Sequence, residues 1–203
     1  MRFLMTLCAL FLLGNVHVAE AQTDSSKEPK TKLIVTINGQ EYNVSEGEEI
    51  RKGGTTVSVK IADSKTFDNG LISFNYPKHF AFEYEEDYGY KNWTLDGNNF
   101  IIMLFEMSDG TLDAFVDEVA GRFGKNNCTI TRSSKQLGSK KLKGKKISVN
   151  LMGEQLTLDL FKVPSRDGKI RIIAFQDSLD EYGNSTDEGF STLKMIQRSI
   201  KYQ

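Results

Sequence analysis

The sequence is poor in the residues that build disulfides and metal sites. Its 203 residues include two cysteines, two histidines and three prolines. Cys8 and His17 fall in an N-terminal leader, so the remaining chain keeps one thiol, Cys128, and one imidazole, His79. One cysteine forms no intrachain disulfide, and this pair does not supply the ligands of a structural zinc site. We therefore expect no bound metal and no cofactor.

The chain also lacks an excess of either charge. Its 26 basic and 27 acidic residues give a formal net charge of −1. Nucleic-acid-binding domains usually carry a strong positive field, so we expect no nucleic-acid partner. The sequence contains neither a G-x-S-x-G nucleophile elbow nor the alternating acids of a calcium loop. These absences favour binding over catalysis, and we expect no enzyme.

The first 21 residues have the pattern of an export signal. Arg2 precedes the apolar run Phe3–Gly14, which is too short to span a bilayer, and Ala19-Glu20-Ala21 is a small-x-small cleavage pattern. We expect cleavage after Ala21 and a secreted or periplasmic protein without a transmembrane segment. Its partner would be an unknown protein or small ligand outside the cytoplasm.

Three further segments follow the predicted signal peptide. Residues 22–32 are polar and predict a flexible lead-in. Residues 33–62 predict a small N-terminal β region, in which Asn38-Gly39 suits the type I′ turn of a hairpin. This region forms either a separate subdomain or an edge addition to the main sheet. Residues 67–203 form the main domain.

The main domain alternates between two hydrophobic periods. Period-2 patterns predict strands at 71–76, 80–84, 90–95, 100–105, 128–132, 155–163 and 169–176. A further, lysine-rich strand follows 128–132 and ends at about residue 149. A 3.6-residue period over 112–123 predicts an amphipathic helix capped by Thr111. A second helix begins at a capping box, Ser185 to Glu188. The pattern predicts an α+β fold, an antiparallel β-sheet with two packed helices.

Four short motifs carry a family resemblance. They are Gly70–Pro77 (GLISFNYP), Thr111–Val116 (TLDAFV), Gly144–Lys146 (GKK) and Ser199–Tyr202 (SIKY). Their order over Phe67 to Tyr202 resembles the PsbP-like fold family, which includes DcrB-like periplasmic proteins and a small Ran-binding nuclear-import factor. The resemblance implies an α/β/α sandwich that works as a non-enzymatic binding or assembly protein. A fold does not choose the partner.

One loop mixes carboxylates with aromatic rings. The candidate ligand-binding residues are Tyr84, Glu86, Asp87, Tyr88, Tyr90 and Trp93. This composition suits a divalent cation, a sugar face or a cationic partner. The alternative is a solvated turn whose aromatic residues face the core.

A second candidate is a basic patch. Five lysines lie within seven residues: Lys140, Lys141, Lys143, Lys145 and Lys146. They suit phosphates, sulfated glycans or anionic lipid headgroups. In a strand, Lys141, Lys143 and Lys145 share one face, so the alternative is a solvated sheet edge.

These features together favour an exported non-enzymatic binding or accessory protein that acts through a surface or cleft. Two alternatives stay open. One is a hydrolytic enzyme with a dispersed site involving His79, which needs a nucleophile and an acid placed nearby. The other is a structural subunit that docks onto an envelope complex through the lysine-rich edge.

Overall fold

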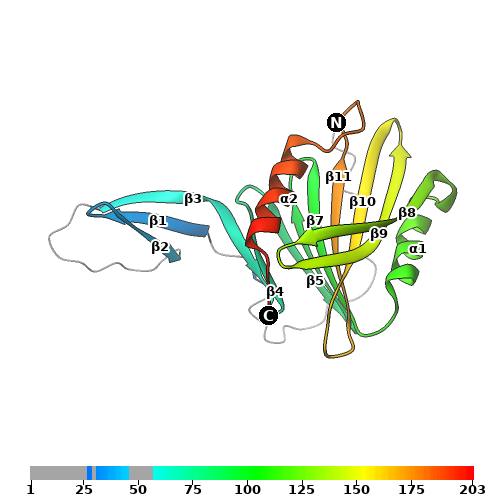
Figure 1. Ribbon diagram of the computed structural model, residues 1–203, viewed down its shortest axis with the longest axis horizontal. Helices are drawn as coiled ribbons and strands as arrows, with labels where there is room; N and C mark the ends of the chain where they lie inside the picture. The colour runs from blue at the N-terminus through cyan, green and yellow to red at the C-terminus, as the bar shows by residue number, and fades with distance from the viewer. Residues whose placement is uncertain (1–26, 29–30, 46–56) are drawn as a thin grey trace.

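The computed structural model describes residues 27–28, 31–45 and 57–203 (Figure 1). The predicted signal peptide, residues 1–21, lies outside these residues, and so does most of the predicted lead-in. The described chain forms two β-sheets, one of seven strands and one of five.

The seven-stranded sheet forms the centre of the molecule. Its strands, in spatial order, are β5 (Ala81–Asp87), β6 (Tyr90–Asp96), β7 (Phe100–Met107), β11 (Ile170–Ser178), β10 (Glu154–Val163), β9 (Lys140–Leu151) and β8 (Cys128–Leu137). All neighbouring pairs are antiparallel. Both faces of β7 are covered, because it contributes Ile102 to one core and Met103 to the other.

The five-stranded sheet contains the N-terminal β region. Its order is β12 (Lys201–Tyr202), β4 (Ile72–Pro77), β3 (Val57–Asp68), β1 (Thr31–Ile37) and β2 (Gln40–Ser45). The hairpin predicted between β1 and β2 is present, and Asn38 and Gly39 have φ of 50° and 78°, as a type I′ turn requires. β3 pairs with β1 over one part and with β4 over another. The N-terminal region therefore joins this sheet and not the edge of the seven-stranded one.

Two α-helices occur within the described ranges. The hydroxyl of Thr111 caps α1 (Leu112–Arg122) by accepting the Ala114 N–H, as predicted. The cap of α2 (Asp187–Ser199) is Thr186, which accepts the Gly189 N–H at 3.1 Å. The predicted Ser185 cap is wrong: Ser185 precedes the cap residue and donates its hydroxyl to Asp177 on β11.

The predicted arrangement of one sheet between two helical layers is wrong. Strands dominate the described chain, and on the face opposite α1 the seven-stranded sheet packs against β3 and β4 of the second sheet as well as α2. α1 contacts β9 and β10, whereas the main neighbour of α2 is β4 in the second sheet (Figure 1). The reason is that the alternation of Ile72–Pro77 marks a half-buried strand but does not say which strands it pairs with. This strand pairs with β3 and β12 and helps to build a second sheet.

Each face of the seven-stranded sheet carries an apolar core. The larger core packs this sheet against β3, β4 and α2, with Phe67, Phe74, Tyr76, Trp93 and Ile196 among its buried members. The smaller core lies under α1 and contains Val116, Ala120 and Leu160. Half-buried side chains, Phe105 and Phe115 among them, border the smaller core. That border is where the structure leaves a cavity.

Candidate functional site

The predicted aromatic and acidic residues are distributed between the two sheet faces. Tyr84 and Trp93 face the larger core, with ring centroids 5.4 Å apart, and Trp93 is 3% exposed. Tyr90 lies on the opposite face, where its ring centroid is 6.2 Å from that of Phe105. In the turn, Tyr88 is exposed and its N–H donates to Asp87. The structure therefore does not bring these residues into one site.

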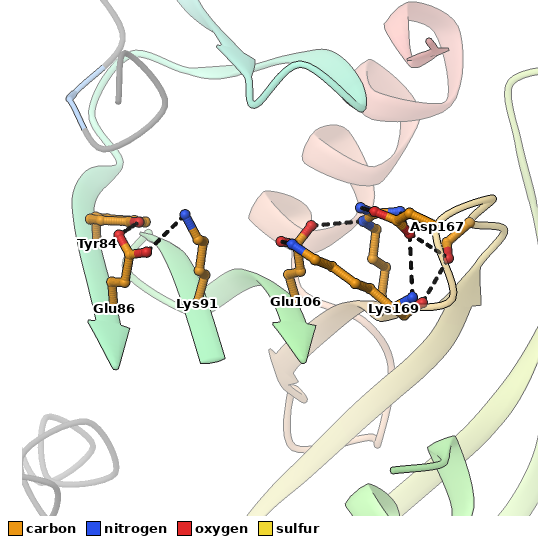
Figure 2. A network of polar contacts seen from close by, with 8 residues as sticks. Tyr84, Glu86, Lys91, Glu106, Asp167 and Lys169 are labelled. Carbon is orange, nitrogen blue, oxygen red and sulfur yellow. Dashed lines mark hydrogen bonds and ion pairs between the residues drawn. The ribbon is translucent and has the colours of Figure 1, made fainter. Parts of the chain in front are cut away.

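Glu86 is held by its neighbours in the sheet. It accepts a hydrogen bond from the hydroxyl of Tyr84, and the Nζ of Lys91 lies 2.8 Å from its Oε1 (Figure 2). The hydrogen bonds from Lys91 and Tyr84 hold the pKa of Glu86 below its usual range. The carboxylate is occupied by this chain's own donors, which does not favour a cation site at Glu86.

The same row of charges continues across β7 and β11. Glu106 accepts from Lys169 Nζ at 2.6 Å and from Arg171 Nε at 2.8 Å (Figure 2). Arg171 also donates to Asp167, and this bond lowers the pKa of Asp167 to about 2. Burial alone would raise the pKa of Glu106, but the bonds from Lys169 and Arg171 outweigh it and lower the pKa. Acids and bases neutralise one another, so we assign this row a structural role.

The five lysines of the predicted basic patch point in different directions. Three have acidic or aromatic partners: Lys140 with the ring of Tyr202, Lys145 with Asp113 on α1, and Lys146 with Asp159. The distances are 4.3 Å to the ring centroid, 3.2 Å and 3.8 Å. Lys141 and Lys143 are exposed. Leu142, which lies between Lys141 and Lys143 on β9, is buried in the larger core. Lys141 and Lys143 therefore point to the opposite face of the strand, as the alternation in the sequence predicted.

His79 forms an ion pair at the surface. Its Nε2 lies 2.8 Å from Oε1 of Glu188, while Oε2 of Glu188 accepts the backbone N–H groups of Asn99 at 2.6 Å and Phe100 at 3.1 Å. The imidazole is half exposed, with its ring centroid 5.0 Å from that of Phe80. Within residues 57–203, no hydroxyl or thiol is hydrogen-bonded to it. The pair joins α2 to two turns of the sheets.

An apolar cavity of about 200 Å³ lies between α1 and the seven-stranded sheet. Its apolar wall includes Met103, Phe105, Met107, Phe115, Val119 and Leu160. The cavity exists because α1 packs on β9 and β10, while the face of β6 and β7 next to it is less closely covered. No single periodicity in the sequence reports such a gap, since each wall has an ordinary strand or helix pattern.

One polar side chain in the cavity wall has an oxygen atom without a hydrogen bond. Asn92 is 7% exposed and its Nδ2 donates to Oγ1 of Thr94 at 3.2 Å, but its Oδ1 has no partner within the described chain. Buried polar atoms are nearly always paired, so Oδ1 of Asn92 is a candidate acceptor for a molecule held in the cavity. Sequence reasoning missed Asn92, although it shares the Tyr90 face of a predicted strand. Of the six predicted residues, only Tyr90 lines this cavity.

The thiol of Cys128 has a structural role. Cys128 begins β8, and its Sγ lies 3.7 Å from the carbonyl oxygen of Ala120. Burial raises the pKa of this thiol, which makes it less reactive. Among the described residues, no three His, Cys, Asp or Glu side chains are grouped to hold a metal ion. No helix in the same part of the chain is long and apolar enough to cross a membrane.

Comparisons with known proteins include a weak structural match. The sequence matches no protein-family model, and no curated protein is significantly similar to it. Among solved structures, the chain is similar to the Ran-binding protein Mog1p of Saccharomyces cerevisiae, with a TM-score of 0.44 and 8% sequence identity. The match covers 68% of this chain and 95% of that chain. At this level the likeness supports no statement about partners or activity.

Proposed function

We propose that this protein is an exported, non-enzymatic binding protein that holds an apolar small molecule in the cavity under α1. The observation that carries the proposal is the apolar cavity whose wall includes Asn92, a residue with an unpaired side-chain oxygen. Small-molecule sites are typically concave and apolar, with few polar groups to orient the ligand. The leader pattern of residues 1–21 supports export.

The size of the cavity limits what fits inside it. A closed apolar cavity of about 150 Å³ accommodates a benzene-sized molecule, whereas drug-sized ligands occupy about 300 Å³ or more. The cavity of about 200 Å³ lies between these values. We therefore propose a ligand that places one ring or a short chain inside, with any longer part outside the cavity.

The other two readings have less support. The only hydrogen-bonding partner of His79 among the described residues is Glu188, whose second oxygen is held by backbone amides, and this pair lacks a nucleophile. The lysines that would dock onto an envelope complex are divided between two faces. Membership in the PsbP-like family stays a prediction that the order of the four motifs supports, and a binding role suits it.

The test is a titration of the mature chain with N-phenyl-1-naphthylamine, an uncharged apolar dye that fluoresces when it leaves water. Val119→Trp fills the cavity from α1, because Val119 lines it. Ala114→Trp is the matched control, since Ala114 is an exposed residue of the same helix that does not line the cavity. We expect saturable binding to the wild type and the control, and at least tenfold weaker binding to Val119→Trp. Absence of saturable binding, or equal binding to both variants, would refute the proposal.

A further inference from the structure

We infer that the ligand of this cavity carries a hydrogen-bond-donating head group, and that the cavity accepts an amine in preference to a carboxylic acid. The inference rests on the proposed function and names the chemical class that the same site selects. It follows from two neighbouring groups in the wall, Asn92 on β6 and Glu85 on β5.

Both residues line the cavity and each has an unpaired acceptor, although Oδ1 of Asn92 is itself buried. Glu85 and Asn92 are directly opposite each other in the β5–β6 pair, and both line the cavity. Glu85 makes no hydrogen bond or ion pair within the described chain, and an ionised carboxylate only accepts. Nδ2 of Asn92 already donates to Thr94, and the other donors of the lining, Tyr90 and Arg122, have interactions of their own. The unpaired polar atoms of the wall are therefore acceptors, and the ligand would supply the donor.

A small side-chain movement brings the unpaired oxygen to the ligand. The χ2 torsion of asparagine is soft, and the turn exchanges the 3.2 Å hydrogen bond from Nδ2 to Thr94 for one between Oδ1 and the ligand. A head group that donates to Oδ1 satisfies a buried acceptor, whereas one that only accepts leaves it unpaired. Pairing of one such group changes affinity by about tenfold. We expect this factor between an alcohol and an ether of similar length.

The charges of the wall separate amines from acids. The charged lining residues are Glu85, Glu118 and Arg122. Arg122 Nη2 lies 2.5 Å from Oε1 of Glu118, one turn away on α1, so this base is already paired with an acid. A ligand carboxylate would meet Glu85 with no uncommitted base beside it in the lining, whereas an ammonium group would pair with Glu85 and donate to Asn92.

The experiment is displacement of N-phenyl-1-naphthylamine by four compounds with an octyl chain, at pH 7 and low salt. Octylamine and octanol donate, octyl methyl ether only accepts, and octanoate is an anion. We expect octylamine to displace the dye at a concentration at least tenfold lower than octanoate, and octanol at about tenfold lower than the ether. Glu85→Gln should reduce the amine-to-acid ratio severalfold. Asn92→Leu should abolish the preference of alcohol over ether while the dye still binds.

Glu83→Gln is the matched control, because Glu83 is an exposed acid on the same strand and face but outside the cavity. Failure of the dye to bind the wild type refutes the proposed function and this inference together. Dye binding with octanoate equal to or better than octylamine refutes the inference alone. The inference alone is also refuted if Glu85→Gln changes the amine-to-acid ratio no more than Glu83→Gln does. Glu85 is only half buried, so this arm remains decisive if Asn92→Leu does not fold.

Discussion

Replacing Glu188 by alanine should destabilise the protein by about 3 kcal/mol. The carboxylate accepts the backbone N–H groups of Asn99 and Phe100 at 2.6 Å and 3.1 Å, and it also contacts His79. A hydrogen bond to a charged group contributes about 1.5–3 kcal/mol, and we count only the two backbone bonds at the lower limit. We assign no energy to His79, because it is half exposed. For a chain of this size the melting temperature should fall by roughly 6–12 °C.

The matched control is Asp187→Ala. Both acids lie in the first turn of α2, so each variant loses the same favourable interaction with the helix dipole, about 0.3–1 kcal/mol. Asp187 is exposed, so it tests the dipole alone. Urea unfolding of the mature chain, followed by the fluorescence of Trp93 in the core, gives both free energies. A loss for Glu188→Ala no larger than that for Asp187→Ala would refute the reasoning.

The contribution of Glu188 should also depend on pH. Burial alone would raise its pKa, but the hydrogen bonds from His79 and Asn99 outweigh burial and hold the pKa below its usual range. The pKa of Glu188 is thus lower in the folded chain than in the unfolded chain. Its ionised form stabilises the fold above the unfolded value of about 4.3, and this stability is lost as pH falls through the folded-state pKa. The difference in the free energy of unfolding between wild type and Glu188→Ala should be largest at pH 7 and should decrease as the pH falls below about 4.3.

Three further substitutions test the packing, each by urea unfolding. Gly144→Ala should cost about 2–3 kcal/mol, because a Cβ there would lie 1.9 Å from the carbonyl oxygen of Leu160 and force β9 and β10 apart; a neutral result contradicts this. Gly121→Ala should stabilise the protein by about 1 kcal/mol, since nothing lies within 4 Å in this helical position; a loss of stability contradicts this. Tyr76→Phe should leave the stability unchanged or raise it, because the buried hydroxyl has no partner among the described residues; a loss above about 1 kcal/mol would show a bond that the structure lacks.

The features that sequence predicted well are local ones. Asn38-Gly39 forms the predicted turn because both residues tolerate positive φ, and Thr111 caps α1 because its hydroxyl reaches an N–H three residues on. β6 and β7 lie within one or two residues of the strands predicted at 90–95 and 100–105. In each case the deciding interactions lie within a few residues along the chain.

The features that sequence did not predict depend on which segments meet. Ser185 and Thr186 are both common cap residues, and both donate to Asp177 on β11, a partner that the local sequence does not identify. Glu86, Lys91, Glu106 and Arg171 lie in one row only because β5, β6, β7 and β11 are neighbours in the sheet. The cavity is likewise a property of where α1 lies. Local patterns give the faces of each element, and the order of strands decides what those faces meet.

The length of β3 sets where this chain can be shortened. A fragment that starts at residue 67 would lose most of β3, including Ser64, Lys65 and Thr66, which pair with β4. A fragment that starts at Val57 would keep that pairing but leave the first part of β3 as a bare edge, since β1 pairs with it there. Bare edges recruit strands from other molecules. In the described chain β1 covers this part of β3 and β2 is the edge strand, so removal of the hairpin moves the open edge from β2 to β3.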